Sequence, residues 1–298
     1  MTRSVWIGGA IAAFIALLSS SLIARTFLRP VHELETVVNR LQQGDFSQRT
    51  TFRRRDEIGS LGAAFDSMAT ELGRHKRLRD DLFHDVAHEL RSPLTNIRCQ
   101  LESFQDGLAS PGPETIASLY EETMLLNRLI DDLRDIALAE AGQLHLEIED
   151  FDVSTELRRV FQAAEPIASM RSVELQLDAS PAVWVRADPG RLGQILNNLI
   201  SNAIHHTGSG SVVKIRSRSQ LSVALIEVED NGPGIPPEHL PFIFDRFYRA
   251  DPVRSRKSGG AGLGLAIVEQ LANLQGGSIT VKSAPGRGCC FSLTLPLI

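Results

Sequence analysis

The sequence predicts a chain of several domains, helical in its first half and α/β in its second. Three observations support this prediction. Residues 5–24 form an uncharged apolar run, residues 31–141 carry apolar side chains at spacings that alternate between three and four, and short strand-like runs appear from residue 144 onward. Alternating spacings of three and four are typical of helices in coiled coils and bundles. Short strands mixed with helices are typical of an α/β domain.

The composition excludes several classes of protein. The chain has 298 residues, enough for about two ordinary domains. Its 43 % hydrophobic and 22 % charged residues exclude a disordered chain, and a net charge of −5 gives no reason to expect a nucleic-acid partner. The three cysteines, Cys99, Cys289 and Cys290, form neither a disulfide framework nor a zinc motif. The main body therefore fits a reducing cytosol.

The apolar run at residues 5–24 predicts a single membrane-spanning helix, because about 20 such residues cross a bilayer. The alternative is a cleaved signal peptide. No small-x-small cleavage site is evident, and a helical pattern resumes directly after Pro30, so the span is favoured. Arg25 and Arg29 follow the run and Arg3 precedes it, which weakly favours a cytoplasmic side C-terminal to the span.

Three helical series follow the span. The first contains Val31, Leu34, Val38 and Leu41 and ends at Gly44-Asp45, the second runs from Ile58 to Leu72, and the third from Phe83 to Phe104. The spacing of eleven residues between the second and third series is a stutter, which locally unwinds a coiled coil. An unbroken seam would also bury His75 and Arg79. We therefore hypothesise a strained joint at residues 73–82.

A second long helix is expected over residues 114–141, after the turn cluster at residues 109–113. Its apolar face consists of Leu119, Leu126, Leu129, Ile130, Leu133 and Ile136. Two antiparallel helices of this length cannot bury both apolar faces alone. The sequence therefore predicts a helical hairpin that dimerises into a four-helix bundle.

Residues 88–94 read His-Glu-Leu-Arg-Ser-Pro-Leu within the third helical series. The helical phase puts His88 on the flank of the apolar seam, among polar neighbours. An accessible imidazole, mostly neutral at cytosolic pH, is a suitable phosphoryl acceptor, and Glu89 could take its ring proton. Pro93 predicts a kink beside the histidine. Taken alone, a His-Glu pair on a helix is more often a surface feature.

Two motifs in the second half could bind a nucleotide with its metal. Asn198 and Asn202 lie one helical turn apart, where their amide oxygens could coordinate a magnesium ion. Residues 230–235, Asp-Asn-Gly-Pro-Gly-Ile, follow an expected strand. The carboxylate of Asp230 could accept a hydrogen bond from an adenine amino group, and the glycines would allow a flat base to approach the backbone. Taken alone, the first motif is more often a pair of surface amides and the second a plain turn.

A glycine-rich string at residues 260–265, Gly-Ala-Gly-Leu-Gly-Leu, leads into an expected helix. Glycine-rich backbone before a helix N-terminus can cradle phosphates. The string does not follow a strand, as a dinucleotide fingerprint does, and it lacks the lysine of a P-loop. Taken alone, it is a weak signal.

The order and spacing of these motifs resemble those of bacterial sensor histidine kinases over nearly the whole chain. Residues 88–94 resemble the H box, 198–203 the N box, 230–235 the G1 box, 242–249 the F box and 260–265 the G2 box, and residues 25–76 resemble a HAMP signal-relay module. The resemblance implies one transmembrane helix (residues 5–24), a HAMP-like coiled coil (25–76), a dimeric phosphotransfer hairpin (77–143) and a Bergerat-type α/β-sandwich ATP-binding domain (144–298).

The resemblance also implies ATP and Mg²⁺ as cofactors and assigns roles to residues. His88, Glu89 and Ser92 match the catalytic H-box positions, and Asn202 and Asn198 match the metal-binding ones. The remaining nucleotide-binding positions are His205, His206, Asp230, Gly232, Gly234, Arg246, Arg249, Gly260, Gly262, Leu263 and Gly264. Residues 245–261 match a mobile ATP lid, from which Arg246 and Arg249 could meet phosphates.

Four features depart from the family pattern. His205 replaces a common lysine, Cys289 a common threonine, and Ser92 a threonine or asparagine that supports dephosphorylation of the partner, so phosphatase activity stays open. In addition, only four residues precede the apolar run, and family members usually carry an extracytoplasmic sensor there. A truncated chain, sensing within the membrane and sensing through another protein are the alternatives.

The implied function is autophosphorylation of His88 by ATP, followed by transfer to an aspartate of a response regulator. The expected partners are that receiver domain, a second copy of the chain and the bacterial inner membrane, with the catalytic part in the cytoplasm. Two alternatives are another ATPase of the same nucleotide fold, such as an Hsp90- or gyrase-like protein, and a catalytically silent membrane scaffold. ATP binding without autophosphorylation would favour the scaffold.

Overall fold

The computed structural model describes residues 2–51, 54–179, 181–250 and 261–298. The chain divides into two compact units, Met1–Asp85 and Val86–Ile298, and each is described by itself. The boundary falls inside one long helix, α3 (Glu57–Gln105).

The first unit begins with an apolar helix and continues into a two-helix arrangement. Helix α1 (Thr2–Ile23) passes through a π-helical turn, η1 (Ala24–Leu28), into α2 (Arg29–Gln42). Within the described residues, one such helical stretch is long and apolar enough to cross a membrane. Helix α2 ends before Gly44, whose φ of 88° belongs to the left-handed region that glycine adopts readily.

The small core of this unit lies between α2 and α3 and contains Val37, Leu41 and Ala69, with Phe46 and Phe65 packed against it. The sequence pattern put Val31 and Val38 in the apolar seam. In the single chain Val37 is buried, whereas Val31 is exposed. Helix α3 also leaves Leu61, Met68 and Leu72 exposed, so much of the coiled-coil seam has no partner within one chain.

Helix α3 runs for 49 residues without interruption and contains Pro93. The strained joint expected at residues 73–82 thus lies on helical backbone. The side chains of His75 and Arg79 are outside the described residues, and the hypothesis of a joint stays a prediction.

In the second unit, the end of α3 and helix α4 (Pro113–Glu140) form the hairpin. Pro113 starts α4, and Gly142, with a φ of 63°, follows its end. The sequence assigned Leu129 and Ile136 to a dimer face. The structure buries both in the core shared with the α/β domain, because α4 packs against helix α8.

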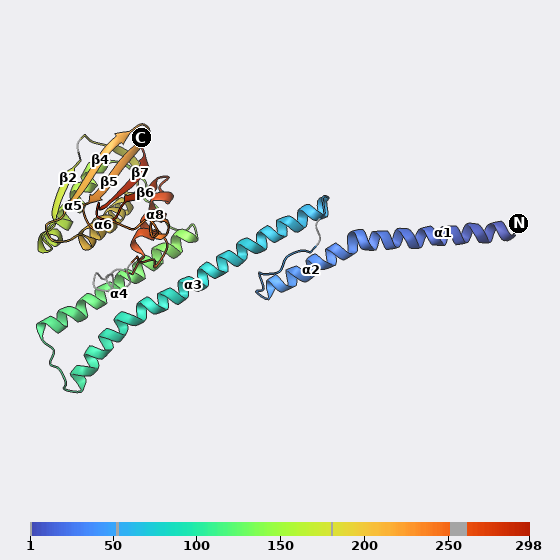
Figure 1. Ribbon diagram of the computed structural model, residues 1–298, viewed down its shortest axis with the longest axis horizontal. Helices are drawn as coiled ribbons and strands as arrows, with labels where there is room; N and C mark the ends of the chain where they lie inside the picture. The colour runs from blue at the N-terminus through green and yellow to red at the C-terminus, as the bar shows by residue number, and fades with distance from the viewer. Residues whose placement is uncertain (1, 52–53, 180, 251–260) are drawn as a thin grey trace. The chain divides into compact units, whose positions relative to one another are not determined.

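The α/β domain follows the hairpin (Figure 1). Its elements in chain order are β1 (Glu149–Asp152), α5 (Val153–Met170), β2 (Glu174–Asp178), β3 (Trp184–Ala187), α6 (Pro189–His206), β4 (Val212–Gln220), β5 (Val223–Asp230), η2 (Leu240–Phe242), α8 (Gly264–Leu274), β6 (Ser278–Ser283) and β7 (Cys289–Pro296). The main sheet has the order β2-β4-β5-β7-β6, with β2 parallel to β4 and the other pairs antiparallel. The short strands β1 and β3 pair separately.

Helices α5, α6 and α8 cover one face of the main sheet (Figure 1). The core lies between these layers and is dominated by fully buried leucines and isoleucines of α6, β4, β5 and α8. This two-layer sandwich confirms the fold class expected from the sequence.

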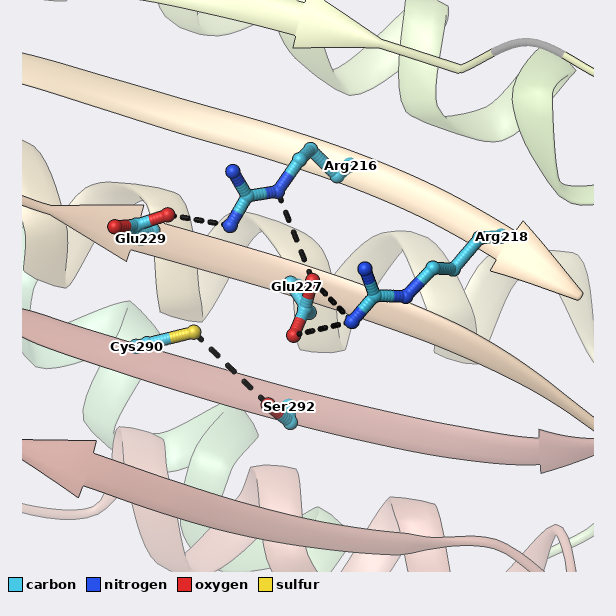
Figure 2. A network of polar contacts seen from close by, with 6 residues as sticks. All are labelled: Arg216, Arg218, Glu227, Glu229, Cys290 and Ser292. Carbon is cyan, nitrogen blue, oxygen red and sulfur yellow. Dashed lines mark hydrogen bonds and ion pairs between the residues drawn. The ribbon is translucent and has the colours of Figure 1, made fainter. Parts of the chain in front are cut away.

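The opposite face of the sheet carries a ladder of polar side chains (Figure 2). Arg216 on β4 stands opposite Glu227 on β5, with 3.6 Å between the guanidinium Nε and the carboxylate, and Arg218 reaches the same carboxylate at 3.2 Å. Ser292 and Cys290 on β7 continue the ladder. The side chain of Glu227 is only 12 % accessible, so these pairs are partly buried, and they place charged groups on the sheet face that the helices leave uncovered.

Candidate active site

Asp230 ends strand β5 and is 9 % exposed. Its Oδ1 accepts hydrogen bonds from the backbone N–H of Gly232 at 2.9 Å and of Cys289 at 3.3 Å. Burial raises the pKa of Asp230, and these two hydrogen bonds act in the opposite direction. The carboxylate is therefore held in place at the end of the strand by two donors from separate segments.

The glycines after β5 are needed because side-chain or backbone atoms of other residues lie directly against them. A Cβ on Gly232 would lie 2.8 Å from Asp230 Oδ1, and one on Gly234 would lie 2.0 Å from the carbonyl oxygen of Ala284. Gly288, with a φ of 72°, packs against the Asp230 backbone from the β6–β7 turn. The loop after β5 and this turn thus form one tight cradle beside Asp230.

Helix α6 carries the two amides predicted to bind a metal. Asn198 lies against the start of α8, since a Cβ on Gly264 would be 3.4 Å from Asn198 Oδ1. Asn202, one turn further along α6, is partly buried. The helix begins with Asp188 as its N-cap, which accepts a hydrogen bond from the N–H of Arg191 at 3.0 Å.

The two histidines at the end of α6 are held mainly as neutral rings. His205 Nδ1 is 2.7 Å from the carbonyl oxygen of Ser201, a contact that requires Nδ1 to carry the proton. Burial lowers the pKa of His205, and burial together with the charges of His205 and Arg249 lowers the pKa of His206. At His205 the chain thus replaces the family's fixed positive charge with an imidazole that favours its neutral form.

The segment after η2 is hydrogen-bonded to the glycine-rich string. The N–H of Phe247 donates to the carbonyl oxygen of Gly262 at 3.0 Å, and Phe247 has a φ of 58°. Leu263 is buried at the start of α8. Gly260, which the sequence assigned to phosphate binding, lies outside the described residues.

Arg246 and Arg249, expected to meet phosphates, contact carboxylates of the hairpin. Arg246 pairs with Glu140 near the end of α4. The guanidinium Nη1 of Arg249 lies 3.9 Å from Oε2 of Glu89. The F-box segment therefore connects the α/β domain to the hairpin at two points.

His88 is exposed, with 71 % of its side chain accessible. Its Nδ1 lies 3.9 Å from Oε1 of Glu89, whose side chain is 29 % accessible. Ser92, one turn further along α3, is also exposed. An exposed imidazole beside a carboxylate can act as a nucleophile with a proton acceptor at hand.

The hairpin and the α/β domain are also joined through α4. Asp135 receives the guanidinium of Arg191 and the side-chain amide of Gln194, each at 2.8 Å. Its neighbour Asp132 is partly buried in the same region, and burial, with the charge of Asp135, raises the pKa of Asp132 to about 6. The interface between α4 and the α/β domain thus combines buried apolar side chains with an acidic cluster.

Sequence reasoning missed Asp188 and Gln275. Asp188 is buried, accepts a hydrogen bond from the N–H of Glu147 at 2.9 Å, and donates its own N–H to Gln275 Oε1 at 2.9 Å. The dipeptide Asp188-Pro189 is a helix-start signal that could have identified the cap. No local signal predicts Gln275, which lies 87 residues away.

At Cys289, where the family often has a threonine, the thiol lies 3.2 Å from the hydroxyl of Ser283. Burial raises the pKa of Cys289 to about 11, so the group is a thiol and not a thiolate at neutral pH. Its backbone N–H, which any residue would supply, is the donor to Asp230.

Three families match successive parts of the chain. Residues 22–74 match the HAMP domain, residues 78–142 the His Kinase A (phospho-acceptor) domain, and residues 187–298 the histidine kinase-, DNA gyrase B- and HSP90-like ATPase. The histidine kinase AdeS of Acinetobacter baumannii has a solved structure that is 30 % identical, with a TM-score of 0.61, and the match covers 70 % of this chain and 98 % of AdeS. The chain belongs to the bacterial two-component sensor histidine kinases.

Other members of the family show the same relationship. The histidine-protein kinase BaeS of Escherichia coli K12 is 34 % identical over 99 % of this chain and 63 % of BaeS. The histidine kinase ThkA, whose structure was solved in complex with the response regulator protein TrrA, is 25 % identical with a TM-score of 0.61, over 78 % of this chain and 66 % of the ThkA chain. The chain spans less than two thirds of the length of the curated sensor kinases it matches.

Proposed function

We propose that this histidine kinase uses ATP to phosphorylate its own His88 and then transfers the phosphoryl group to an aspartate of a response regulator. The observation that carries the proposal is a continuous set of contacts: His88 faces Glu89, and Glu89 faces Arg249 of the ATP-binding domain. The acceptor, a base and a cation from the nucleotide domain are thus neighbours in one compact unit.

The site fits ATP with Mg²⁺. Asp230 would accept the adenine amino group, and Gly232, with no Cβ, lets the loop lie directly against the Asp230 carboxylate. The amide oxygens of Asn198 and Asn202 are hard donors suited to Mg²⁺. The binding site would be completed by two arginines, two histidines and the residues of the glycine-rich segments: Arg246, Arg249, His205, His206, Gly234, Gly260, Gly262, Leu263 and Gly264. When bound, Mg²⁺ offsets the negative charge of the phosphates.

The chain's own residues supply the acceptor chemistry. Glu89 faces Nδ1 of His88, which leaves Nε2 to attack the γ-phosphorus of ATP. Glu89 takes the Nδ1 proton as the phosphorus–nitrogen bond forms, and ADP leaves with the electron pair of the broken bond. Ser92 keeps a hydroxyl one turn away, where it could orient water when the partner is dephosphorylated. Most of the protein's contribution is positioning and electrostatics.

The partners follow from exposed surfaces. The hairpin leaves large apolar side chains exposed: Leu94 and Leu101 of α3 and Ile116, Tyr120 and Ile130 of α4. Their exposure supports a homodimer in which a second copy of the chain buries them. ThkA was solved with a response regulator, which supports a receiver domain as the partner here. The exposed apolar side chains of α1 support anchoring in the bacterial inner membrane, with the catalytic part in the cytoplasm.

The test is autophosphorylation of the full chain in lipid nanodiscs with γ-labelled ATP, beside His88→Gln. Acid-labile, base-stable label on the parent and none on the variant would support the kinase and its acceptor together. ATP binding without label on the parent would refute the proposal and favour a silent scaffold.

A further inference from the structure

The carboxylate of Glu89 lies between two neighbours that belong to different domains. Oε1 is 3.9 Å from Nδ1 of His88, on the same helix, and Oε2 is 3.9 Å from Nη1 of Arg249, in the ATP-binding domain. The Glu89 side chain is 29 % accessible and that of Arg249 16 %. Ion pairs of low accessibility are less screened by salt than exposed ones. This pair can therefore influence how Glu89 is oriented.

Arg249 is presented from a segment that is itself held. Tyr248, directly before it, shares a hydrogen bond of 2.7 Å with Nδ1 of His239 and packs on the ring of Phe242. Phe247 is tied to Gly262 through its backbone N–H. The guanidinium thus approaches the hairpin from a fixed base and not from the end of a free loop.

We propose that Arg249 is a positioning residue for Glu89, which deepens the proposed function and rests on it. The guanidinium holds Oε2, so that Oε1 stays directed at the Nδ1 proton of His88. The tautomer with the proton on Nδ1 leaves Nε2 as the nucleophile. When the bond from Nε2 to the γ-phosphorus forms and ADP departs with its electron pair, the Nδ1 proton passes to Oε1. Because Arg249 belongs to the ATP-binding domain, the base is fully oriented only while that domain is docked on the hairpin.

The test is a double-mutant cycle on the full chain at saturating ATP. General bases contribute about 10²–10⁴-fold, so Arg249→Gln should lower the autophosphorylation rate by about ten-fold in the parent. In a Glu89→Gln background the same change should lower it by less than about two-fold, because the group it orients is gone. Arg218→Gln is the matched control, since Arg218 pairs with Glu227 on the sheet face away from the helices. Its effect should be the same in both backgrounds.

A second measurement separates orientation of the base from ATP binding. Phosphoramidate, a small phosphoryl donor, can phosphorylate an imidazole without a nucleotide site. Arg249→Gln should slow labelling of His88 by phosphoramidate, and Arg218→Gln should not. The positioning role is wrong if Arg249→Gln raises only the KM for ATP, lowers the autophosphorylation rate by the same factor with and without Glu89→Gln, and leaves the phosphoramidate rate unchanged. Failure of the proposed function would instead show as no ATP-dependent label on the parent.

A different observation, in the first unit, supports a second inference. After α1 the chain passes through the π-helical turn η1. Such turns are rare in proteins, and those that occur often lie at functional sites. Nη1 of Arg54 donates to the carbonyl oxygen of Thr26 in this turn at 2.7 Å, and its Nε donates to Oδ2 of Asp56 at 2.9 Å. Oδ1 of Asp56 accepts from the N–H of Gly59 at 3.0 Å, in the first turn of α3.

Gly59 allows the connector, the segment between α2 and α3, to lie against the start of α3. A Cβ there would be 2.1 Å from the carbonyl oxygen of Arg54. The hydrogen bonds from Arg54 are also the main cause that lowers the pKa of Asp56. One guanidinium thus joins the end of the apolar helix to the N-terminal cap of α3.

We infer that Arg54 is a mechanical link that passes displacements at the membrane exit directly to the start of α3. The covalent route runs through α2 and the connector, whereas the Arg54 route bypasses both. Coupling of this kind is reciprocal, so a change at either end alters the other.

The test is hydrogen exchange on the full chain in nanodiscs. Asp56→Asn weakens the link at α3, and it should speed exchange of amides in residues 24–28 as well as in the first turn of α3. Arg54→Met should do the same from the centre of the link. Arg49→Met is the matched control, because Arg49 bonds Phe46, Gln48 and Thr70 and does not reach η1. If residues 24–28 exchange at the parent rate in Arg54→Met and Asp56→Asn, the link is refuted.

Discussion

Replacing Asp188 by alanine should destabilise the ATP-binding domain by about 2–4 kcal/mol. The buried carboxylate satisfies two backbone N–H groups, those of Glu147 and Arg191, at 2.9 and 3.0 Å. Each buried donor left without a partner costs about 1–3 kcal/mol, and loss of a helix N-cap costs about 1 kcal/mol. The second bond is the cap itself, so these costs overlap and the sum stays at the lower end of the range.

Asp188→Asn is the matched variant, because asparagine caps helices as well as aspartate does but replaces one acceptor oxygen with a donor. We expect it to lose less than half as much stability as Asp188→Ala. The assay is urea unfolding followed by Trp184 fluorescence in a Trp6→Phe background, since the chain has two tryptophans. Trp184 lies on β3, close in sequence to the mutated residue. A loss below about 0.5 kcal/mol in Asp188→Ala, or equal losses in both variants, would refute the reasoning.

Three further predictions follow from the site and the helices. Gly232→Ala should weaken binding of a fluorescent ATP analogue by about ten-fold or more, because its Cβ would meet Asp230 Oδ1 at 2.8 Å, whereas Gly208→Ala, with open space around it, should leave affinity unchanged. Burial raises the pKa of Asp132 to about 6. Protonation of Asp132 should therefore stabilise the folded state as the pH falls through 6 toward 4, and Asp132→Asn should remove that part of the pH dependence of the thermal midpoint. Inserting three residues within residues 73–82 should restore a continuous heptad register and change the autophosphorylation rate of the full chain, and an unchanged rate would contradict a strained joint.

Much of the fold could be predicted from local patterns. The sequence predicts strands at residues 212–218, 223–229, 278–283 and 289–295 and helices near 154–169, 189–206 and 262–275. These agree within a few residues with β4, β5, β6, β7, α5, α6 and α8, because alternation and helical periodicity are visible in a short window. Strand β1 was missed, since Glu149–Asp152 has three acidic residues in four and little alternation. Its strand conformation depends on pairing with β3.

For the hairpin, the apolar residues of α4 were identified correctly, but the surfaces that bury them were only partly predicted. The apolar face of α4 was assigned to a dimer as a whole. Leu129 and Ile136 are buried against the nucleotide domain within one chain, whereas Ile130 stays exposed. A heptad pattern states which side chains avoid water, but not which partner covers them.

The sequence by itself determined the succession of an apolar helix, coiled-coil helices, a hairpin with His88 and an α/β domain, together with the motifs that identify the family. These features are written in neighbouring residues, through periodicity, capping and glycine at positions of unusual φ. Only the tertiary structure decided which distant groups meet: Asp230 with Cys289, Asp188 with Gln275, Glu89 with Arg249 and Arg54 with Thr26. Such contacts depend on strand register and on packing between elements, and no short stretch of sequence encodes either of them.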